Sequence, residues 1–377
     1  MRLRSFFVWY HAWLGLLSGV LFAIVGLTGS VLVFYLEIGG LFHPEITARV
    51  EAPVPELSRV VAMLRAEFPD RSGPWRIELP RDGRYPLTAR YMKPKDRPLN
   101  GFSPLIVNID SATLKITRQY FWGAEPLTWL YDLHYTLLLG ESGRFVLGVL
   151  VLAWLVFLGV GLWLWWPKRR RLRDALRIDW SSKWPKRIYT WHVVPMVYIF
   201  PVLLVLCVTG FVLIMPQWSK PLIGTFSPLT PYFSGASPCD VRLTSPLNAD
   251  EVVQIALGQF PDAIPRWVET PSPDRGIWRV QLAQPWEPGQ RFPRTQVWLD
   301  ACSGSILAMR NPQKNSSGDT FMDWQHPLHN GEALGLLGRI FVCVAGFLPC
   351  LAFLTGVSRW RLRRVAQHKS VARKSRV

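Results

Sequence analysis

Four of the seven histidines in this 377-residue chain recur at matching positions in its two halves. His11 and His192 are each followed, 17 and 18 residues later, by a Thr-Gly pair. His134 and His329 are each followed by Gly-Arg after nine and ten residues, and by a further glycine after 27. A neutral imidazole is a common ligand for haem iron and other transition metals. The recurrence therefore predicts two paired ligand sites, although a duplication would copy structural histidines as well.

Four apolar stretches are long enough to cross about 30 Å of hydrocarbon. Hydrophobic residues make up 49% of the chain, and its 19 tryptophans fit the aromatic belts of membrane interfaces. The first stretch has no small-x-small cleavage site after it, so we expect an uncleaved anchor rather than a signal peptide. The predicted fold class is a membrane α-helical protein with α+β external units.

The net charge of +17 is confined to three short segments beside the apolar stretches. Residues 1–10, 167–187 and 359–377 hold the whole excess, while acidic and basic residues balance in the remainder. This positive-inside pattern predicts that both termini and the loop after the second span are cytoplasmic. It argues against nucleic-acid binding and favours contact of the basic segments with anionic membrane lipid.

The expected organisation alternates spans with external segments. Transmembrane spans are predicted at 1–36, 145–166, 192–216 and 334–358, external units at 37–144 and 217–333, and basic cytoplasmic segments at 167–191 and 359–377.

The two external segments also repeat each other. Residues 56–69 and 250–261 both show helical apolar spacing and end at Phe-Pro. Residues 105–116 and 296–306 each contain two strand-like runs joined by Asp, Ser or Gly, the residues that hairpin turns require. We expect a helix packed on a small antiparallel sheet in each segment.

This order of elements resembles the PepSY domain and its associated transmembrane family. The resemblance covers nearly the whole chain in two pseudo-symmetric repeats, each with a V-x-x-D-x-x-[ST]-like hairpin. It also includes the Tyr10-His11 and Trp191-His192 openings, the Thr-Gly pairs and two Leu-His-x8-Gly-Arg elements. Within the family the chain is most similar to the ferrioxamine-type ferric-siderophore reductases of the bacterial inner membrane. That resemblance implies bound haem, a multi-pass inner-membrane location and periplasmic PepSY-like units.

The predicted topology determines how the histidines pair. His11 and His192 lie at the cytoplasmic ends of their spans, whereas His134 and His329 lie on the outer side. We therefore expect two haem b groups, one held by His11 and His192 and the other by His134 and His329. Covalent c-type attachment is excluded because no Cys-x-x-Cys-His occurs. His134 and His329 precede their spans by about ten residues. Either the haems lean inward, or the segments after these histidines turn at Gly140, Gly143, Gly331 and Gly335 and bring the histidines back toward the membrane.

The other candidates are weaker. His326 lies three residues before His329 and would share its helix face, which allows metal contact or support of a ligand. His43 has no counterpart in the second half and is a candidate for iron or siderophore contact. Cys239 and Cys302 both fall in the second external unit, where the sequence leaves a disulfide open.

Two main classes of function follow from the sequence. The first is a dihaem electron carrier, a haem-dependent ferric-siderophore reductase that releases Fe(II) in the periplasm. The alternatives are a siderophore or iron permease, or a periplasmic sensor or binding scaffold without redox activity. Ligand pairs at both membrane faces favour electron transfer over binding of cargo at the midplane. Because no nucleotide- or flavin-binding motif is present, the electron donor is expected to be a separate quinol or cytoplasmic reductant.

Overall fold

The computed structural model describes residues 3–43, 56–80, 87–92, 94–96, 102–167, 171–237, 239 and 247–374. The chain divides into two compact units. The first, the helical bundle, is formed by residues 1–33, 131–216 and 328–377, and the second, the sheet unit, by residues 34–130 and 217–327.

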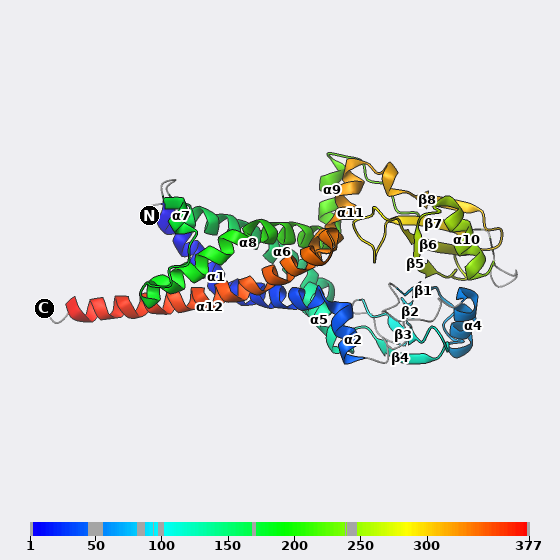
Figure 1. Cartoon of the computed structure of the whole chain (residues 1–377), viewed down its shortest axis with the longest axis horizontal. Helices are drawn as coiled ribbons and strands as arrows, with labels where there is room; N and C mark the ends of the chain where they lie inside the picture. Colours follow the sequence, from blue (N-terminus) through cyan, green and yellow to red (C-terminus); the bar gives the residue numbers. More distant parts are fainter. Residues whose placement is uncertain are drawn as a thin grey trace. The chain divides into compact units, whose positions relative to one another are not determined.

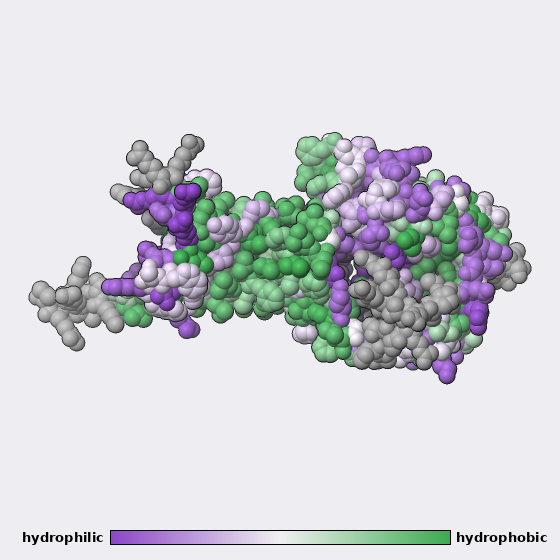
Figure 2. All heavy atoms as spheres, in the orientation of Figure 1, coloured by the Kyte–Doolittle hydropathy of each residue, from purple (hydrophilic) through white to green (hydrophobic). Residues whose placement is uncertain are grey.

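Four long helices form the bundle, and both termini lie at the same end of it (Figure 1). They are α1 (Leu3–Leu32), α6 (Gly140–Trp165), α8 (Trp184–Ile214) and α12 (Gly335–Lys374). Each contains a stretch long and apolar enough to cross a membrane. The surface of the bundle is hydrophobic along its length and hydrophilic at the end with the termini (Figure 2). The chain is a multi-pass membrane protein.

The helices do not begin and end at the limits of the predicted spans. The helix α6 begins five residues before the predicted 145, α8 begins at Trp184 rather than 192, and α12 continues to Lys374 rather than 358. Hydropathy marks only the part suited to hydrocarbon, whereas backbone hydrogen bonding continues into the polar flanks.

Glycines allow α1 and α12 to pack backbone against backbone. A Cβ atom built on Gly26 would lie 2.4 Å from the carbonyl oxygen of Gly346, and one on Gly346 would lie 2.4 Å from that of Gly26. Ser30 adds a hydrogen bond from its hydroxyl to the carbonyl of Cys343, at 2.7 Å. Small residues with a hydroxyl bond are the usual means of close helix packing in membranes.

Seven shorter α-helices complete the described α-helical structure. They are α2 (Tyr35–Phe42), α4 (Leu57–Glu67), α5 (Pro126–Thr136), α7 (Leu172–Ala175), α9 (Pro216–Gly224), α10 (Ala249–Gln259) and α11 (Ser317–His329). The helix α7 links α6 to α8 within the bundle unit, and the others belong to the sheet unit or lead from one unit into the other.

All described strands belong to one antiparallel sheet with the order β4-β3-β2-β1-β5-β6-β7-β8. The first-half strands are β1 (Trp75–Glu78), β2 (Leu87–Tyr91), β3 (Leu105–Ile109) and β4 (Ile116–Phe121). The second-half strands are β5 (Ile264–Glu269), β6 (Ile277–Ala283), β7 (Thr295–Asp300) and β8 (Ile306–Arg310). The expected helix and hairpin are present in each half, with β3–β4 and β7–β8 as the hairpins.

The two halves of the sheet unit are joined, which the sequence did not indicate. Strand β1 pairs with β5, placing Ile77 opposite Val268, so four strands from each half share one ladder. One apolar core includes residues of both α4 and α10. The carboxylate of Asp250, on α10, accepts hydrogen bonds from the backbone N–H groups of Leu57 and Ser58 at the start of α4. The two predicted external segments therefore form a single folded unit.

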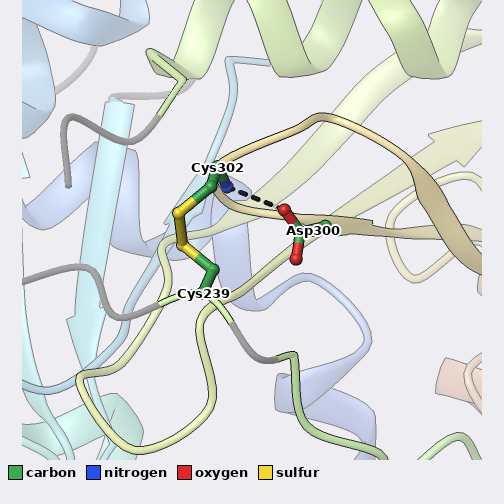
Figure 3. A group of neighbouring side chains, drawn as sticks. All are labelled: Cys239, Asp300 and Cys302. Atoms are coloured by element: carbon green, nitrogen blue, oxygen red, sulfur yellow. Dashed lines mark hydrogen bonds between the residues drawn. A yellow bond between two sulfur atoms is a disulfide. The ribbon is translucent and has the colours of Figure 1, made fainter.

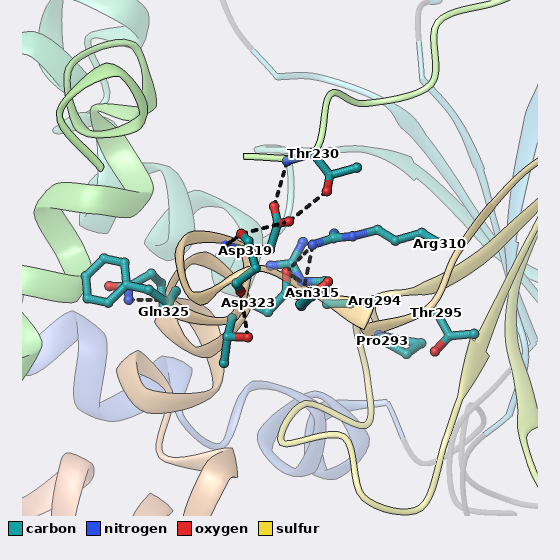
Figure 4. A network of polar contacts seen from close by, with 12 residues as sticks. Thr230, Pro293, Arg294, Thr295, Arg310, Asn315, Asp319, Asp323 and Gln325 are labelled. Atoms are coloured by element: carbon teal, nitrogen blue, oxygen red, sulfur yellow. Dashed lines mark hydrogen bonds and ion pairs between the residues drawn. The ribbon is translucent and has the colours of Figure 1, made fainter. Parts of the chain in front are cut away.

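A disulfide and several hydrogen bonds stabilise the second half of the sheet unit. Cys239 and Cys302 form a disulfide, and the Asp300 carboxylate accepts a hydrogen bond from the Cys302 N–H at 3.0 Å (Figure 3). Near the start of α11, Asp319 accepts from the N–H and hydroxyl of Thr230 at 2.9 and 2.7 Å (Figure 4). Asp323, one turn later, accepts from Arg310 and Asn315 (Figure 4). These bonds fix the first turns of the helix that ends in His329.

Candidate metal centres in the helical bundle

The four recurring histidines lie in the bundle as two pairs. The rings of His11 and His192, the first pair, have centroids 6.4 Å apart and planes at 84°. The rings of His134 and His329, the second pair, have centroids 6.2 Å apart and planes at 54°. A metal ion bonded to two opposed imidazoles at about 2 Å each places the ring centroids roughly 6 Å apart. Both separations suit two axial ligands of one metal.

Hydrogen bonds to α1 determine the tautomer of His134. Its Nδ1 lies 3.0 Å from the carbonyl oxygen of Val25 and 3.1 Å from the hydroxyl oxygen of Thr28. A carbonyl oxygen only accepts, and the Thr28 hydroxyl donates to the carbonyl of Ile24, at 2.8 Å. Nδ1 of His134 must therefore carry the proton, which leaves Nε2 with the lone pair that a metal requires.

The same arrangement recurs for His329 against α8. The Nδ1 of His329 lies 2.9 Å from the Thr209 hydroxyl oxygen, and Thr209 donates its own proton to the Val205 carbonyl at 2.7 Å. The Thr209 oxygen is thus an acceptor for the Nδ1 proton. Both imidazoles of the second pair have the same orientation relative to the helix that supports them.

In the first pair, only His192 has this support. Its Nδ1 donates to the Ala352 carbonyl and the Thr355 hydroxyl of α12, both at 3.0 Å, while Thr355 donates to the Leu351 carbonyl. His11 faces α6, where Val160 occupies the position that threonine has in the other three helices.

The environment of His11 relies on stacking instead. Its ring lies over that of Phe157, with centroids 4.2 Å apart and planes at 5°. The Nδ1 atom is buried and makes no hydrogen bond of regular geometry to any residue in the described part of the chain.

Each imidazole also packs on a glycine of the helix that supports it. A Cβ atom built on Gly29 would lie 2.9 Å from Cε1 of His134, and one on Gly210 would lie 3.2 Å from that of His329. At Gly161 and Gly356 the corresponding distances, to His11 and His192, are 3.0 and 3.4 Å. These glycines let the rings approach the helix closely enough for Nδ1 to reach its backbone.

A tight turn brings His134 back toward α1, which is one of the two arrangements that the sequence left open. The helix α5 ends at Thr136, and Leu137 and Leu138 have left-handed backbone angles with φ of 53° and 61°. A Cβ atom on Gly143 would lie 1.6 Å from the Thr136 carbonyl oxygen, so only glycine permits the reversal into α6. His134 therefore contacts α1 at Val25, 14 residues from His11, which is about 21 Å along the helix.

A buried tryptophan lies between the two histidine pairs along the bundle. Trp154 of α6 is 1% exposed, donates from Nε1 to the Ser18 hydroxyl at 3.1 Å, and stacks on Phe22 with centroids 4.5 Å apart. Ser18 and Phe22 lie on α1 between His11 and Val25. One stacked pair of aromatic rings therefore lies in the apolar core between the two histidine pairs.

A cavity of about 400 Å³ lies at the first pair. Both histidines line it, and Gly15, Gly19, Gly161 and Gly356 leave room on its walls for a flat ligand. Three arginines also line it, namely Arg4, Arg359 and Arg363. The volume falls within the roughly 300–1,000 Å³ of organic cofactor sites, and the arginines provide donors for acidic substituents of the ligand.

Comparison with protein families decides the classification. The family model for the PepSY-associated TM region matches residues 8–363. The chain belongs to the PepSY-associated TM family. The match includes all four paired histidines and the four long helices. No curated protein matches the chain at a significant level.

The two weaker candidates of this PepSY-associated TM protein, His326 and His43, lie in the sheet unit. His326 meets Phe292 edge to face, with centroids 5.3 Å apart. His43 follows α2 and lines a separate cavity. Among the described residues, one group of three has metal-ligating atoms close together, Cys239, Asp300 and Cys302, and its two sulfurs are bonded to each other (Figure 3).

Sequence reasoning missed the residues that orient the imidazoles. Thr28-Gly29 and Thr209-Gly210 were visible as repeat positions, but nothing in their spacing showed that they contact His134 and His329. The third instance, Thr355-Gly356, was the signal that could have revealed their role, since it places the same dipeptide on a third helix.

Proposed function

We propose that this PepSY-associated TM protein binds two b-type haems and conducts electrons across the bacterial inner membrane to a ferric siderophore. The observation that carries the proposal is the pair of imidazoles at each of two levels, with Nδ1 held by the supporting helix at three of the four histidines. A histidine whose Nδ1 proton is bonded to the protein presents Nε2 to a metal in a fixed direction.

The residues at the first pair fit a haem. His11 and His192 would hold its iron, the surrounding glycines would accommodate the macrocycle, and Arg4, Arg359 and Arg363 would pair with the propionates. His134 and His329 would hold the second haem. When bound, haem iron supplies a one-electron couple whose potential depends on its axial ligands and their hydrogen bonds.

The distribution of basic residues indicates how the protein is oriented in the membrane. By the positive-inside rule, the basic segments at the end of the bundle with both termini would make that end cytoplasmic and the first pair the inner one. We infer that the two halves arose by duplication, and that the sheet unit is periplasmic. The electron donor would be a quinol or a cytoplasmic reductant.

The proposed reaction is a one-electron reduction of chelated Fe(III) to Fe(II). A siderophore holds iron with hard oxygen donors, which bind ferric iron more tightly than ferrous iron, so reduction promotes release. With His134 and His329 both holding the second haem, the ferric chelate would accept the electron without binding to the haem iron.

The test is reoxidation of the purified, dithionite-reduced protein by a ferric siderophore, with a ferrous chelator present to trap the product. We expect the reduced spectrum to decay while the Fe(II) complex accumulates in equal amount. The His329→Ala variant, which retains the first pair, serves as the control and should react much more slowly. An unchanged reduced spectrum, as expected of a permease, would contradict the proposal.

A further inference from the structure

The sheet unit contains a second cavity, of about 130 Å³, which the electron path does not use. It lies between α2 and the face of β1–β4 opposite the apolar core. Apolar side chains line much of its wall, among them Leu36, Phe42, Trp122 and Leu127. Its polar lining includes three arginines, Arg90, Arg118 and Arg291.

The arginines outnumber the acidic groups that neutralise them. Arg90 and Arg291 both bind the single carboxylate of Glu78, with N–O distances of 2.8 and 2.9 Å. Arg118 forms its own ion pair with Glu125. Among the described residues that line the cavity, three arginines therefore face two carboxylates, those of Glu78 and Glu125.

This positive charge is enclosed rather than exposed to solvent. The side chains of Arg90, Arg291 and Glu78 are 12%, 19% and 16% exposed. Burial alone would raise the pKa of Glu78, but Arg291 and Arg90 outweigh it and hold that pKa below its ordinary value. Glu78 is thus charged and committed to the two arginines.

Neighbouring groups increase the positive potential. Arg76 and Arg90 both stack on Trp267, 4.3 and 4.7 Å from the ring centroid. Burial, together with the charges of Arg279 and Arg90, lowers the pKa of Arg76 to about 10, which still leaves it charged at neutral pH. In addition, Nε of Arg90 is buried and donates to no acceptor among the described residues. A buried donor without an acceptor is costly unless a ligand provides one.

The volume of the cavity limits the size of the ligand that it can bind. A volume near 130 Å³ is well below the roughly 300–1,000 Å³ of sites for drug-sized ligands, so a whole siderophore complex does not fit. A carboxylate matches the guanidinium fork in geometry and charge. The apolar walls favour an organic acid over fully hydrated inorganic phosphate.

We propose that this cavity binds an organic carboxylate, either a small free acid or the carboxylate arm of a ferric chelate. The free-acid form of the proposal stands without any redox activity. That the carboxylate belongs to an iron complex rests on the proposed function, and it makes anionic carboxylate chelates better substrates than cationic hydroxamate chelates.

The test is isothermal titration of the full-length, oxidised protein in detergent with four probes. They are citrate, gallium(III) citrate, a cationic gallium(III) hydroxamate and inorganic phosphate; gallium replaces iron so that no electron transfer occurs. We expect saturable binding of citrate or gallium citrate, and weaker or no binding of the other two. Preference for free citrate identifies a free acid, and preference for gallium citrate identifies a chelate arm.

Variants connect the binding to the cavity. Arg90→Gln leaves Arg291 and Glu78 as a neutral pair and should weaken carboxylate binding about tenfold or more. Arg71→Gln is the matched control, because Arg71 lies in the same half of the sheet but pairs with Asp96 outside the cavity, and it should bind normally. Leu127→Trp fills the cavity without changing its charge and should also weaken carboxylate binding. This variant provides the test if Arg90→Gln does not fold.

Three results would overturn the proposal. They are the absence of carboxylate binding, a tighter affinity for phosphate, and equal affinities in wild-type, Arg90→Gln and Leu127→Trp proteins. Because these titrations need no electrons, their failure would leave haem content and siderophore reduction unaffected. Failure of the proposed function would likewise leave carboxylate binding measurable.

Discussion

The two histidine pairs differ in how the protein holds their imidazoles. Both rings of the second pair have Nδ1 at a threonine whose own proton is used elsewhere. In the first pair His192 has such a threonine, whereas His11 faces Val160 and stacks on Phe157. A bonded Nδ1 proton makes the imidazole a more basic and better oriented ligand. The first pair is therefore the asymmetric one, with one strongly and one weakly supported ligand.

The largest expected effect is the loss of a whole haem. His134→Ala and His329→Ala should each remove the second haem and leave the first, while His11→Ala and His192→Ala should do the opposite. The reason is that one imidazole cannot maintain the six-coordinate, low-spin state that two provide. The measurement is haem content together with the low-spin absorption spectrum of each variant. If His11→Ala and His192→Ala removed different spectral components, the pairing would be wrong.

An exchange of threonine and valine tests the asymmetry directly. Thr355→Val gives His192 the environment of His11 and should weaken haem binding at the first pair about 10–100-fold. Val160→Thr adds the missing acceptor and should tighten binding there and shift the potential of that haem to more negative values. Haem transfer to excess apomyoglobin and a redox titration measure the two effects.

Thr209→Val is the matched control for this exchange. It removes the acceptor for His329, so it should weaken the second site and leave the first unchanged. The proposed asymmetry of the first pair would be contradicted if the Val160→Thr variant folded normally but changed neither haem binding nor haem potential at that pair.

Smaller effects are expected from the glycines that contact the imidazoles. The Cβ atom of Gly29→Ala would lie 2.9 Å from Cε1 of His134, a ring held by two acceptors, so haem binding at the second pair should weaken several-fold. The Cβ atom of Gly356→Ala would lie an ordinary 3.4 Å from His192. That variant should keep its haem and gain about 0.5–1 kcal/mol in helix stability. Identical haem retention in the two variants would show that these contacts do not position the rings.

The sequence indicated which histidines come together because their pairing depends on local features, whereas their role as ligands stays a prediction. Repeat offsets identified His11, His134, His192 and His329, and the alternation of apolar spans with basic segments determined which lie at the same level. A turn after His134, at Gly140 and Gly143, was one of the two arrangements left open, and the structure also uses left-handed Leu137 and Leu138. Hairpins such as β3–β4 were predictable because turn residues mark them.

The missed features all depend on contacts between distant segments. The pairing of Ile77 with Val268 joins strands separated by almost half the chain, and no periodicity specifies such a partner. The support of His192 by Thr355 likewise depends on how two helices pack. Of the two arginines at Glu78, Arg90 lies on β2 and Arg291 lies in the loop between β6 and β7, so only the folded unit brings them together.

The central claim is that the four histidines hold two haems, and haem stoichiometry tests it most directly. A pyridine-haemochrome assay on purified protein, normalised to protein by amino-acid analysis, should give two b-type haems per chain. The same assay should give one per chain for the double variant His134→Ala/His329→Ala. A value near zero for the wild-type protein expressed with ample haem, or two haems in the double variant, would contradict the claim.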